Sequence, residues 1–407
     1  MQSHKNFPAS WLITLLALVS MLTLAACSNG NAPTPTNSAP KAAPASQQTY
    51  RIPIVAKDIS TLDPGEATDV NSITAIDLIF TGLVSLNDKL DVQPQLANTW
   101  SVSQDGLTWT FKLKPNLKFS DGSPLTSADV AYSIDRALSP AVFNTTGISL
   151  TYLGLIKGAA DRTSGKLASI IGTGILTPDP STVIINVTKA TAYFLEALSY
   201  PTSYVVEKSV FNKWGSTVGD HLSDNHGQGG DGPFKLQSYN HNTGLVFVPN
   251  PNFENKQPQL QRIQLDFLKD ANTSYLEYQT NQLDSSGVPS VDIQQAKALP
   301  NKQFHQSPLL ATDYFGLNYL VKPFDNIKIR EAMELALNKD VIAQAVWRGL
   351  VVPTNHIVPK GMFGYDTNLI GPDGVAATSG DTAKAKQLFA AGMQEEGLTL
   401  ATFPTIN

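Results

Sequence analysis

Hydrophobic and polar residues alternate in several short stretches of the chain, and this period of two is typical of half-buried β-strands. The clearest case is residues 108–113, where Trp109, Phe111 and Leu113 alternate with threonine and lysine. Short apolar runs predict further strands elsewhere. These runs lie at residues 51–56, 181–187, 244–249, 260–268 and 398–403.

Apolar residues at every third or fourth position predict helices between these strands. Asp121 to Pro124 predicts a turn, and Thr126 with Asp129 three residues later is typical of a helix start. The apolar positions that follow share one helical face: Val130, Ile134 and Leu138. Further helices are expected at 71–83, closed by Gly82, at 273–281, at 291–299 and at 327–349, which a cap near Asn338 divides. The mixture indicates an α/β protein.

Composition narrows the possible partners. The chain has 29 basic and 34 acidic side chains and no long run of either sign. Nucleic acid is therefore not an expected partner. The residues after position 48 are enough to build two or more domains, and no fixed-period repeat divides them.

The beginning of the chain has the pattern of a secretory signal. An apolar run at 11–24 precedes two alanines and Cys27, the single cysteine. The run is shorter than the roughly 20 residues of a transmembrane helix, which favours export. Leu24 to Cys27 resembles the bacterial lipobox, so we expect lipid on Cys27; a buried or incidental cysteine is the alternative. Residues 28–48, rich in Pro, Ser, Ala and Asn, predict an extended tether.

Three motifs suggest chemistry that their surroundings do not support. Residues 227–232 match G-x-G-x-x-G, but no strand precedes them and Pro-Phe stands where a helix should begin, so no nucleotide site is expected. The acidic residues and histidines within 220–226 match no metal-binding spacing and predict a solvated loop. Asp63 could be a catalytic acid, but a turn residue that accepts bonds from backbone amides explains it better.

An enzyme is not the expected class. The chain contains no G-x-S-x-G, and its five histidines after the tether lie in no nucleophile context. No cofactor and no metal are predicted. A surface-anchored hydrolase therefore stays the least favoured interpretation.

Five longer motifs together resemble a known family. They occur in this order: TLDP at 61–64, residues 93–138, GDGPFKL at 230–236, residues 323–342 and AKAKQLFAAG at 383–392. In sequence and order they are similar to the family 5 solute-binding proteins of ABC importers, which include dipeptide-, oligopeptide- and nickel-binding receptors. One departure is Asp231, where the family more often has threonine.

The resemblance implies a periplasmic-binding-protein-like fold of type II (cluster C), with two lobes built from three mixed α/β domains. The implied boundaries are a signal peptide at 1–26, a tether at 27–49, domain I at 50–80 and 207–308, domain II at 81–206, and domain III from 309 to 407. Domain III is expected to be incomplete. In peptide-binding members an aspartate pairs with the ligand's ammonium group, and its segment would lie beyond residue 407.

The resemblance also implies which residues line the ligand cavity. They form three segments: Thr68, Asp69, Val70 and Asn71; Ser285, Ser286, Gly287 and Val288; and Asp313, Tyr314 and Phe315. Helix capping is the alternative for the first segment, and strand packing is the alternative for the third.

The implied function is that of a substrate-binding lipoprotein that captures di- or oligopeptides by hinge closure. It would be a monomer, anchored outside the cytoplasm by lipid on Cys27, and would deliver its ligand to an ABC permease and ATPase. Main-chain hydrogen bonds would give such a cleft broad selectivity. Another solute, such as a nickel chelate or an oligosaccharide, and a receptor or chaperone on the same fold are the alternatives.

Overall fold

The computed structural model describes residues 43–44, 47–306, 311–360, 362 and 364–404. Residues 48–407 form one compact unit, and the expected signal peptide, Cys27 and most of the tether lie outside the described residues. In the part of the chain that is described, no helix is long and apolar enough to cross a membrane.

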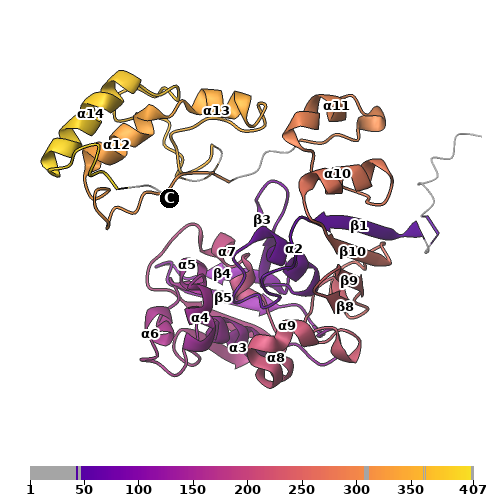
Figure 1. Cartoon of the computed structure of the whole chain (residues 1–407). Helices are drawn as coiled ribbons and strands as arrows, with labels where there is room; N and C mark the ends of the chain where they lie inside the picture. The colour runs from indigo at the N-terminus through magenta and orange to yellow at the C-terminus, as the bar shows by residue number, and fades with distance from the viewer. Residues whose placement is uncertain (1–42, 45–46, 307–310, 361, 363, 405–407) are drawn as a thin grey trace, which may run out of the picture. The chain divides into compact units, whose positions relative to one another are not determined.

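The first sheet contains the beginning of the folded chain (Figure 1). Its strand order is β1-β10-β9-β8. The bounds are β1 Thr49–Ile54, β8 Phe234–Asn240, β9 Gly244–Pro249 and β10 Arg262–Phe267. β1 runs parallel to β10, with Thr49 opposite Arg262 and Ile54 opposite Phe267, whereas the other pairs are antiparallel. β1 is therefore an edge strand whose parallel partner comes from far along the chain.

The second sheet is antiparallel and has the order β4-β5-β7-β6. Its strands are β4 Ala97–Val102, β5 Thr108–Leu113, β6 Ile175–Asp179 and β7 Thr182–Asn186. A short pair, β2 Val84–Leu86 and β3 Val92–Pro94, precedes it. Phe111 and Leu113 of β5 are buried, which confirms the inward face that the alternation predicts.

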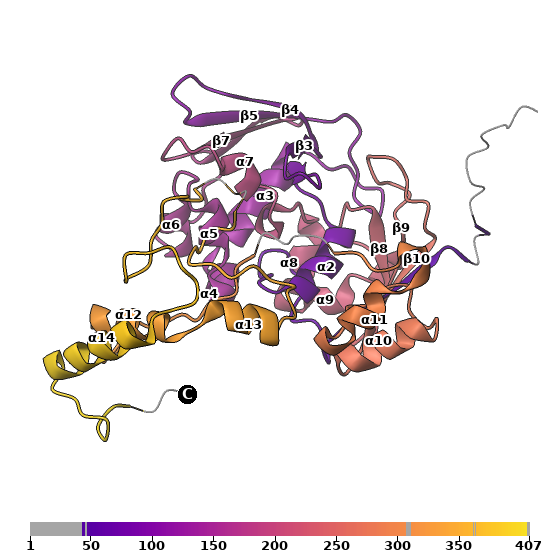
Figure 2. The same cartoon turned by 90° about the horizontal axis from the view of Figure 1, so that it is seen from above.

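Helices connect the strands of both sheets (Figures 1 and 2). Among the described residues up to position 306 they are α2 Val70–Ile79, α3 Ser127–Ala137, α4 Pro140–Thr146, α5 Ser149–Leu153, α6 Ala159–Thr163, α7 Phe194–Ala197, α8 Lys208–Trp214, α9 Val218–His221, α10 Ala271–Gln279 and α11 Ile293–Lys297. α3 begins with the predicted capping box of Thr126 and Asp129. The helix predicted at 71–83 is wrong at its end, because α2 stops at Ile79 and Phe80 to Leu83 lead into the second sheet.

Two separate clusters of buried apolar side chains stabilise this part of the protein. One draws on residues between Leu83 and Val205 and contains Phe111, Ile134 and Phe194. The other draws on Ile54 to Phe80 and on Val206 to Leu265. The chain thus leaves one core near residue 80, builds a second core, and returns to the first near residue 206.

Residues 311–404 contain three further helices: α12 Ile327–Ala336, α13 Lys339–Ala345 and α14 Thr382–Glu395. Asn338 caps α13 through its side chain, 2.9 Å from the Val341 amide, as predicted. No strand occurs among the described residues of this region. The strand predicted at 398–403 is therefore wrong, because these residues form turns and have no neighbouring strand to pair with.

Candidate ligand site

The carboxyl ends of the parallel strands β1 and β10 define the first candidate surface. In open α/β sheets, ligands bind in the crevice outside the carboxyl ends of parallel strands. α2 starts after the loop that follows β1, and α10 starts four residues after β10 ends. Asp69 and Asp270 cap these two helices, each 2.9 Å from a backbone amide. Both helices therefore start, with a capping aspartate, at the end of the loop that follows a parallel strand.

The segment Thr68 to Asn71 lies in the first of these loops. Thr68 is exposed, and Val70 is 78% exposed although it is apolar. Burial alone would raise the pKa of Asp69, but hydrogen bonds from Ser72 and Ser60 outweigh it and lower that pKa. Helix capping is confirmed for Asp69, while a role in ligand contact stays a prediction.

One oxygen of Asp69 has no protein partner. Oδ1 accepts the Ser72 amide, but Oδ2 is buried and forms no hydrogen bond with any described residue. Buried polar atoms normally have a partner in the protein or a bound water. The carboxylate therefore keeps an acceptor that is not used by the capping interaction.

Tyr200 contacts the same loop from the other core, and the sequence analysis did not predict this. Its hydroxyl donates to the Ala67 carbonyl at 3.1 Å, and its ring stacks on Tyr152 at 3.6 Å between centroids. Burial raises the pKa of Tyr200 to about 12, so the hydroxyl stays a donor at neutral pH. The local sequence shows only that Tyr200 follows an apolar stretch. It cannot predict the contact, because 133 positions separate Tyr200 from Ala67.

The segment Ser285 to Val288 is held beside β1 by the residue that precedes it. Asp284 accepts the Arg51 amide at 2.8 Å and donates its own amide to the Arg51 carbonyl at 3.0 Å. The Asp284 carboxylate also pairs with the Arg51 guanidinium at 3.0 Å. Ser286 Oγ lies 2.6 Å from Ser274 Oγ of α10. This segment therefore lies along the free edge of the first sheet.

The third segment, Asp313 to Phe315, has no regular structure. Tyr314 is 71% exposed and Phe315 is 84% exposed. Strand packing is therefore the wrong interpretation of these residues. Among the described residues, no hydrogen bond or ion pair joins any two of the three predicted segments.

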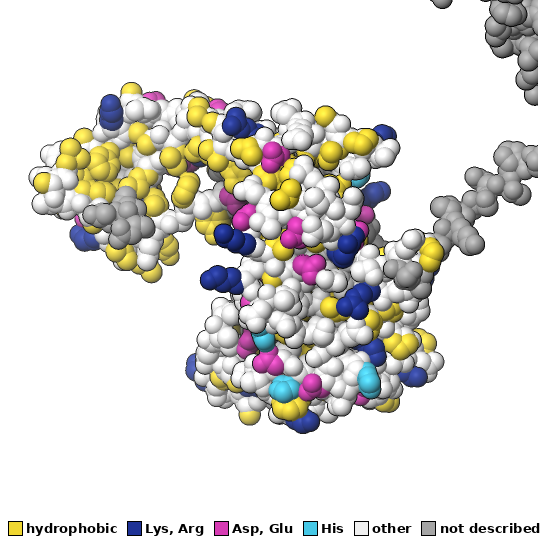
Figure 3. Space-filling view, turned by 45° about the vertical axis from the view of Figure 1, so that its right-hand side comes forward, with side chains coloured by type: hydrophobic (Ala, Val, Ile, Leu, Met, Phe, Trp, Pro, Cys, Tyr) yellow, Lys and Arg dark blue, Asp and Glu magenta, His cyan; other side chains and the backbone are white. Residues whose placement is uncertain are grey.

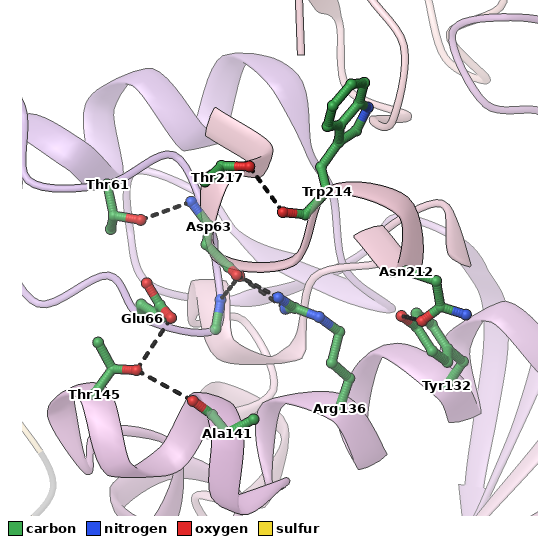
Figure 4. A network of polar contacts seen from close by, with 11 residues as sticks. Thr61, Asp63, Glu66, Tyr132, Arg136, Ala141, Thr145, Asn212, Trp214 and Thr217 are labelled. Atoms are coloured by element: carbon green, nitrogen blue, oxygen red, sulfur yellow. Dashed lines mark hydrogen bonds and ion pairs between the residues drawn. The ribbon is translucent and has the colours of Figure 1, made fainter. Parts of the chain in front are cut away.

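Asp63 forms a different polar network, which Figure 4 shows. Its Oδ1 accepts the Gly65 amide at 3.0 Å, as expected of a turn residue. Both of its oxygens also pair with the Arg136 guanidinium, at 2.9 and 2.5 Å. The ion pair is buried and joins the loop before α2 to α3. Since both oxygens are occupied by a cation, Asp63 is not placed to act as a general acid.

An open depression of about 480 Å³ lies beside this network. Its charged lining is already paired, because Arg136 binds Asp63 and Arg162 binds Asp135 at 3.1 Å. Burial and the neighbouring Asp63 raise the pKa of Glu66, the remaining acid at this site. Both arginines of the lining are therefore occupied by carboxylates, and Glu66 accepts a hydrogen bond from the Thr145 hydroxyl at 3.1 Å.

Several polar residues at 220–226 form pairs with their neighbours. His221 Nδ1 lies 2.9 Å from Asp224, and its ring stacks on Trp214 at 3.4 Å. In the described part of the chain, no three His, Cys, Asp or Glu side chains are grouped so that they could hold a metal ion.

Comparison with known proteins identifies the family. Residues 91–405 match the family described as bacterial extracellular solute-binding proteins, family 5 Middle. The oligopeptide-binding protein OppA of Bacillus subtilis is 28% identical over 400 residues, covering 96% of this chain and 70% of OppA. The glutathione-binding protein GsiB of Escherichia coli O1:K1 is 28% identical over 311 residues, covering 76% of this chain and 56% of GsiB.

The fold is also that of solved family structures. Haemophilus influenzae OppA in complex with the peptide RPPGFSPFR has a TM-score of 0.75 at 24% identity, covering 87% of this chain and 68% of that one. The resemblance found in the motifs and the expected binding-protein fold are both confirmed. The chain belongs to family 5 of the bacterial extracellular solute-binding proteins.

Proposed function

We propose that this chain is the solute receptor of an ABC importer and binds short peptides outside the cytoplasm. The observation that carries the proposal is the similarity to an oligopeptide-binding protein across 96% of the chain. The chain spans 70% of that relative, so binding by the whole protein is an inference from the shared part.

The proposed contacts are made by the loop that follows β1 and by the segment that lies along the free edge of β1. Thr68, Asn71 and Ser285 carry neutral polar groups that can bond a peptide backbone. Val70, at the start of α2 after that loop, is exposed and offers an apolar contact. Main-chain hydrogen bonds supply affinity independent of the ligand's side chains, which suits a receptor for many peptides. Asp313 to Phe315 would supply further contacts from the part of the chain at 311–404.

Ligand capture would proceed by hinge closure. A ligand that makes better contacts in the closed form shifts the population toward it, and a permease can then recognise that form. The separate apolar clusters support the proposed boundary between domain I and the inserted domain II at 81–206. The proposal includes no catalysis, because the chain contains no G-x-S-x-G and the matching family is one of solute-binding proteins.

The membrane attachment is proposed to be a lipid on Cys27. A Cys27→Ser variant should be released into the soluble extracytoplasmic fraction after signal cleavage, while the natural protein stays with the membrane. Fractionation and intact mass would measure this. A Cys27→Ser protein that is cleaved and still wholly membrane-bound contradicts the anchor.

Peptide binding is tested with the full-length protein and two matched variants. Val70→Arg places a charge at the proposed site, and Val102→Arg places the same charge on the exposed edge of β4. Calorimetric titration with ligands identified by native mass spectrometry should show about tenfold weaker binding for the first variant and none of this loss for the second. Equal affinities for both variants would remove the start of α2 from the binding site.

A second pair of variants separates capping from ligand contact at Asp69. Asp69→Ser keeps a capping oxygen but removes the carboxylate, whereas Asp69→Ala removes both. If the carboxylate contacts ligand, both variants lose affinity, and only the alanine variant loses stability by about 1 kcal/mol. Retained affinity in Asp69→Ser would leave Asp69 a helix cap alone.

A second ligand class is favoured by one comparison. GsiB is a glutathione-binding protein and is also 28% identical over 311 residues. Competition between glutathione and a longer peptide on the same protein distinguishes the two classes. If glutathione displaces a bound ligand and the longer peptide does not, the proposed ligand is glutathione.

A further inference from the structure

The glycine-rich loop at 227–233 is a junction between the two apolar cores. Gly232 donates its amide to the Ile79 carbonyl at 2.7 Å. The Ser120 amide donates to the Gly230 carbonyl at 2.7 Å, and the Glu207 amide donates to Gly229 at 3.0 Å. The loop therefore bonds the segments by which the chain leaves one core and returns to it.

The glycines are explained by this close approach. A Cβ atom on Gly230 would lie 2.3 Å from the Ile79 carbonyl oxygen, and one on Gly232 would lie 2.5 Å from the Ile79 carbonyl carbon. Side chains at either position would separate the backbones. Close backbone packing therefore accounts for these glycines of the G-x-G-x-x-G match.

Asp231 is the one ionisable residue within this loop, and it is 1% exposed. Its Oδ1 accepts the Thr81 amide at 2.9 Å, and its Oδ2 lies 2.5 Å from the Thr81 hydroxyl. No Lys, Arg or His among the described residues forms an ion pair with it. A buried carboxylate without a cation is costly when it is charged.

The charged and titratable groups that face Asp231 do not compensate for its charge. Glu254 is a further acid whose charge disfavours a second one, and its own carboxylate is paired with Lys114 at 2.8 Å. Tyr204 faces Asp231 from the returning segment, and its hydroxyl donates to Asp77 at 2.9 Å. Burial raises the pKa of Asp231 to about 7.

We propose that Asp231 acts as a proton-dependent latch at the junction between the two cores, closed when the carboxyl is neutral and weakened when it is ionised. The Thr81 hydroxyl can accept a hydrogen bond from the neutral acid or donate one to the carboxylate, so a hydrogen bond persists in both states. The difference between the two states is therefore the buried charge itself. This inference goes beyond the proposed function and does not depend on peptide binding.

The sign of the effect follows from linkage. A carboxyl group whose folded-state pKa is raised holds a proton that the unfolded chain has already lost. The folded state is thus favoured most at low pH, and the contribution of Asp231 falls as the pH rises from the ordinary carboxyl value toward about 7. A carboxylate paired with a cation would show the opposite trend.

The test compares Asp231→Asn with the natural full-length protein from about pH 5 to about pH 8. The asparagine keeps the shape and an acceptor for the Thr81 amide but cannot ionise. We expect the melting temperature of the natural protein to fall by about 2–8 °C more than that of the variant over this range. Asp135→Asn, at a carboxylate paired with Arg162, is the control and should not flatten the profile.

Identical pH profiles for Asp231→Asn and the natural protein would overturn the latch. If the asparagine variant fails to fold, Asp231→Thr replaces the acid by another neutral hydrogen-bonding group and gives the same test. Hydrogen exchange of the natural protein provides a second readout, since protection of the Thr81 amide should fall at least severalfold above about pH 7 after correction for intrinsic rates. Unchanged protection would also contradict the latch.

Discussion

The described residues up to position 306, here called the first region, and residues 311–404, the second region, bury apolar side chains very differently. The first region contains clusters of 25 and 19 buried apolar residues between and beside its sheets. In the second region six apolar residues are buried: Ile329, Ala332, Leu335, Ala343, Ala385 and Met393. This region nevertheless holds 17 of the 27 large apolar side chains that are exposed in the described chain.

This difference in burial shows that a sheet gives helices a broad apolar surface to pack against. α12 and α14 both start with a side-chain cap, Asn326 and Asp381. The two helices pack closely at Gly392, where a Cβ atom would lie only 2.7 Å from Ile329 Cγ1. Without a sheet in the described residues, however, each helix buries only one narrow stripe. Apolar side chains accordingly gather on the surface over these helices at the upper left of Figure 3.

The largest expected change in stability comes from removing the cation of a buried ion pair in the first region, compared with an exposed pair in the second. Arg136→Ala leaves Asp63 buried without its cation and should destabilise the first region by about 3–5 kcal/mol. Lys322→Ala breaks a pair whose lysine is 77% exposed and should leave the melting temperature unchanged. Thermal unfolding of both variants measures this. A comparable loss of stability in both variants would show that exposure does not determine how much these two ion pairs contribute.

The next largest effect is expected when a buried isoleucine is shortened to alanine in each region. Ile134 and Ile329 are both fully buried, one in a large cluster and the other between two helices. Ile134→Ala should lower the stability of the first region by about 2–5 kcal/mol. Ile329→Ala should increase hydrogen exchange in α12 and α14 and leave the first region protected. Exchange that spreads to both regions in either variant would show that they unfold as one cooperative unit.

A smaller effect is expected at His241 in the first region. Its ring nitrogens lie 2.7 Å from Asp58 and 3.1 Å from Asp220, and only an imidazolium can donate to both. The hydrogen bond with Asp58, with the charges of both acids, raises the pKa of His241.

The stabilisation from this contact should be complete below the ordinary histidine pKa of about 6.5 and lost as the pH rises through the raised value. Because the side chain is 55% exposed, we expect a change in melting temperature of only about 1–2 °C. His241→Gln and Asp58→Asn should both remove this pH dependence. A pH profile that neither variant alters would exclude the contact as its source.

The smallest effect is expected for exposed apolar residues of the second region. Val352 is 85% exposed, so Val352→Ser should change stability by no more than about 0.5 kcal/mol. It should, however, lower the binding of a hydrophobic dye, whereas Val102→Ser in the first region should not. A clear loss of stability in Val352→Ser would mean that this side chain packs against something in solution.

The candidate site was predictable in part. Helix capping at Asp69 is visible in the sequence, because a cap depends on residues three positions away. The position of Ser285 beside β1 is not, since it depends on contacts between Arg51 and Asp284 across 233 positions. Tyr200 was missed for the same reason. Its hydrogen-bond partner Ala67 is 133 positions away.

Periodicity and local side-chain bonding were enough to predict the capping box of α3, the inward face of β5 and the break at Asn338. These features depend on neighbours within about four residues, and any short window of the chain contains them. The motifs, taken in order, were enough for the family. The parallel pairing of β1 with β10, the Asp63–Arg136 pair and the burial of Asp231 were not visible. Each of these joins distant segments, and a pairing between distant segments exists only once both cores have formed and excluded water.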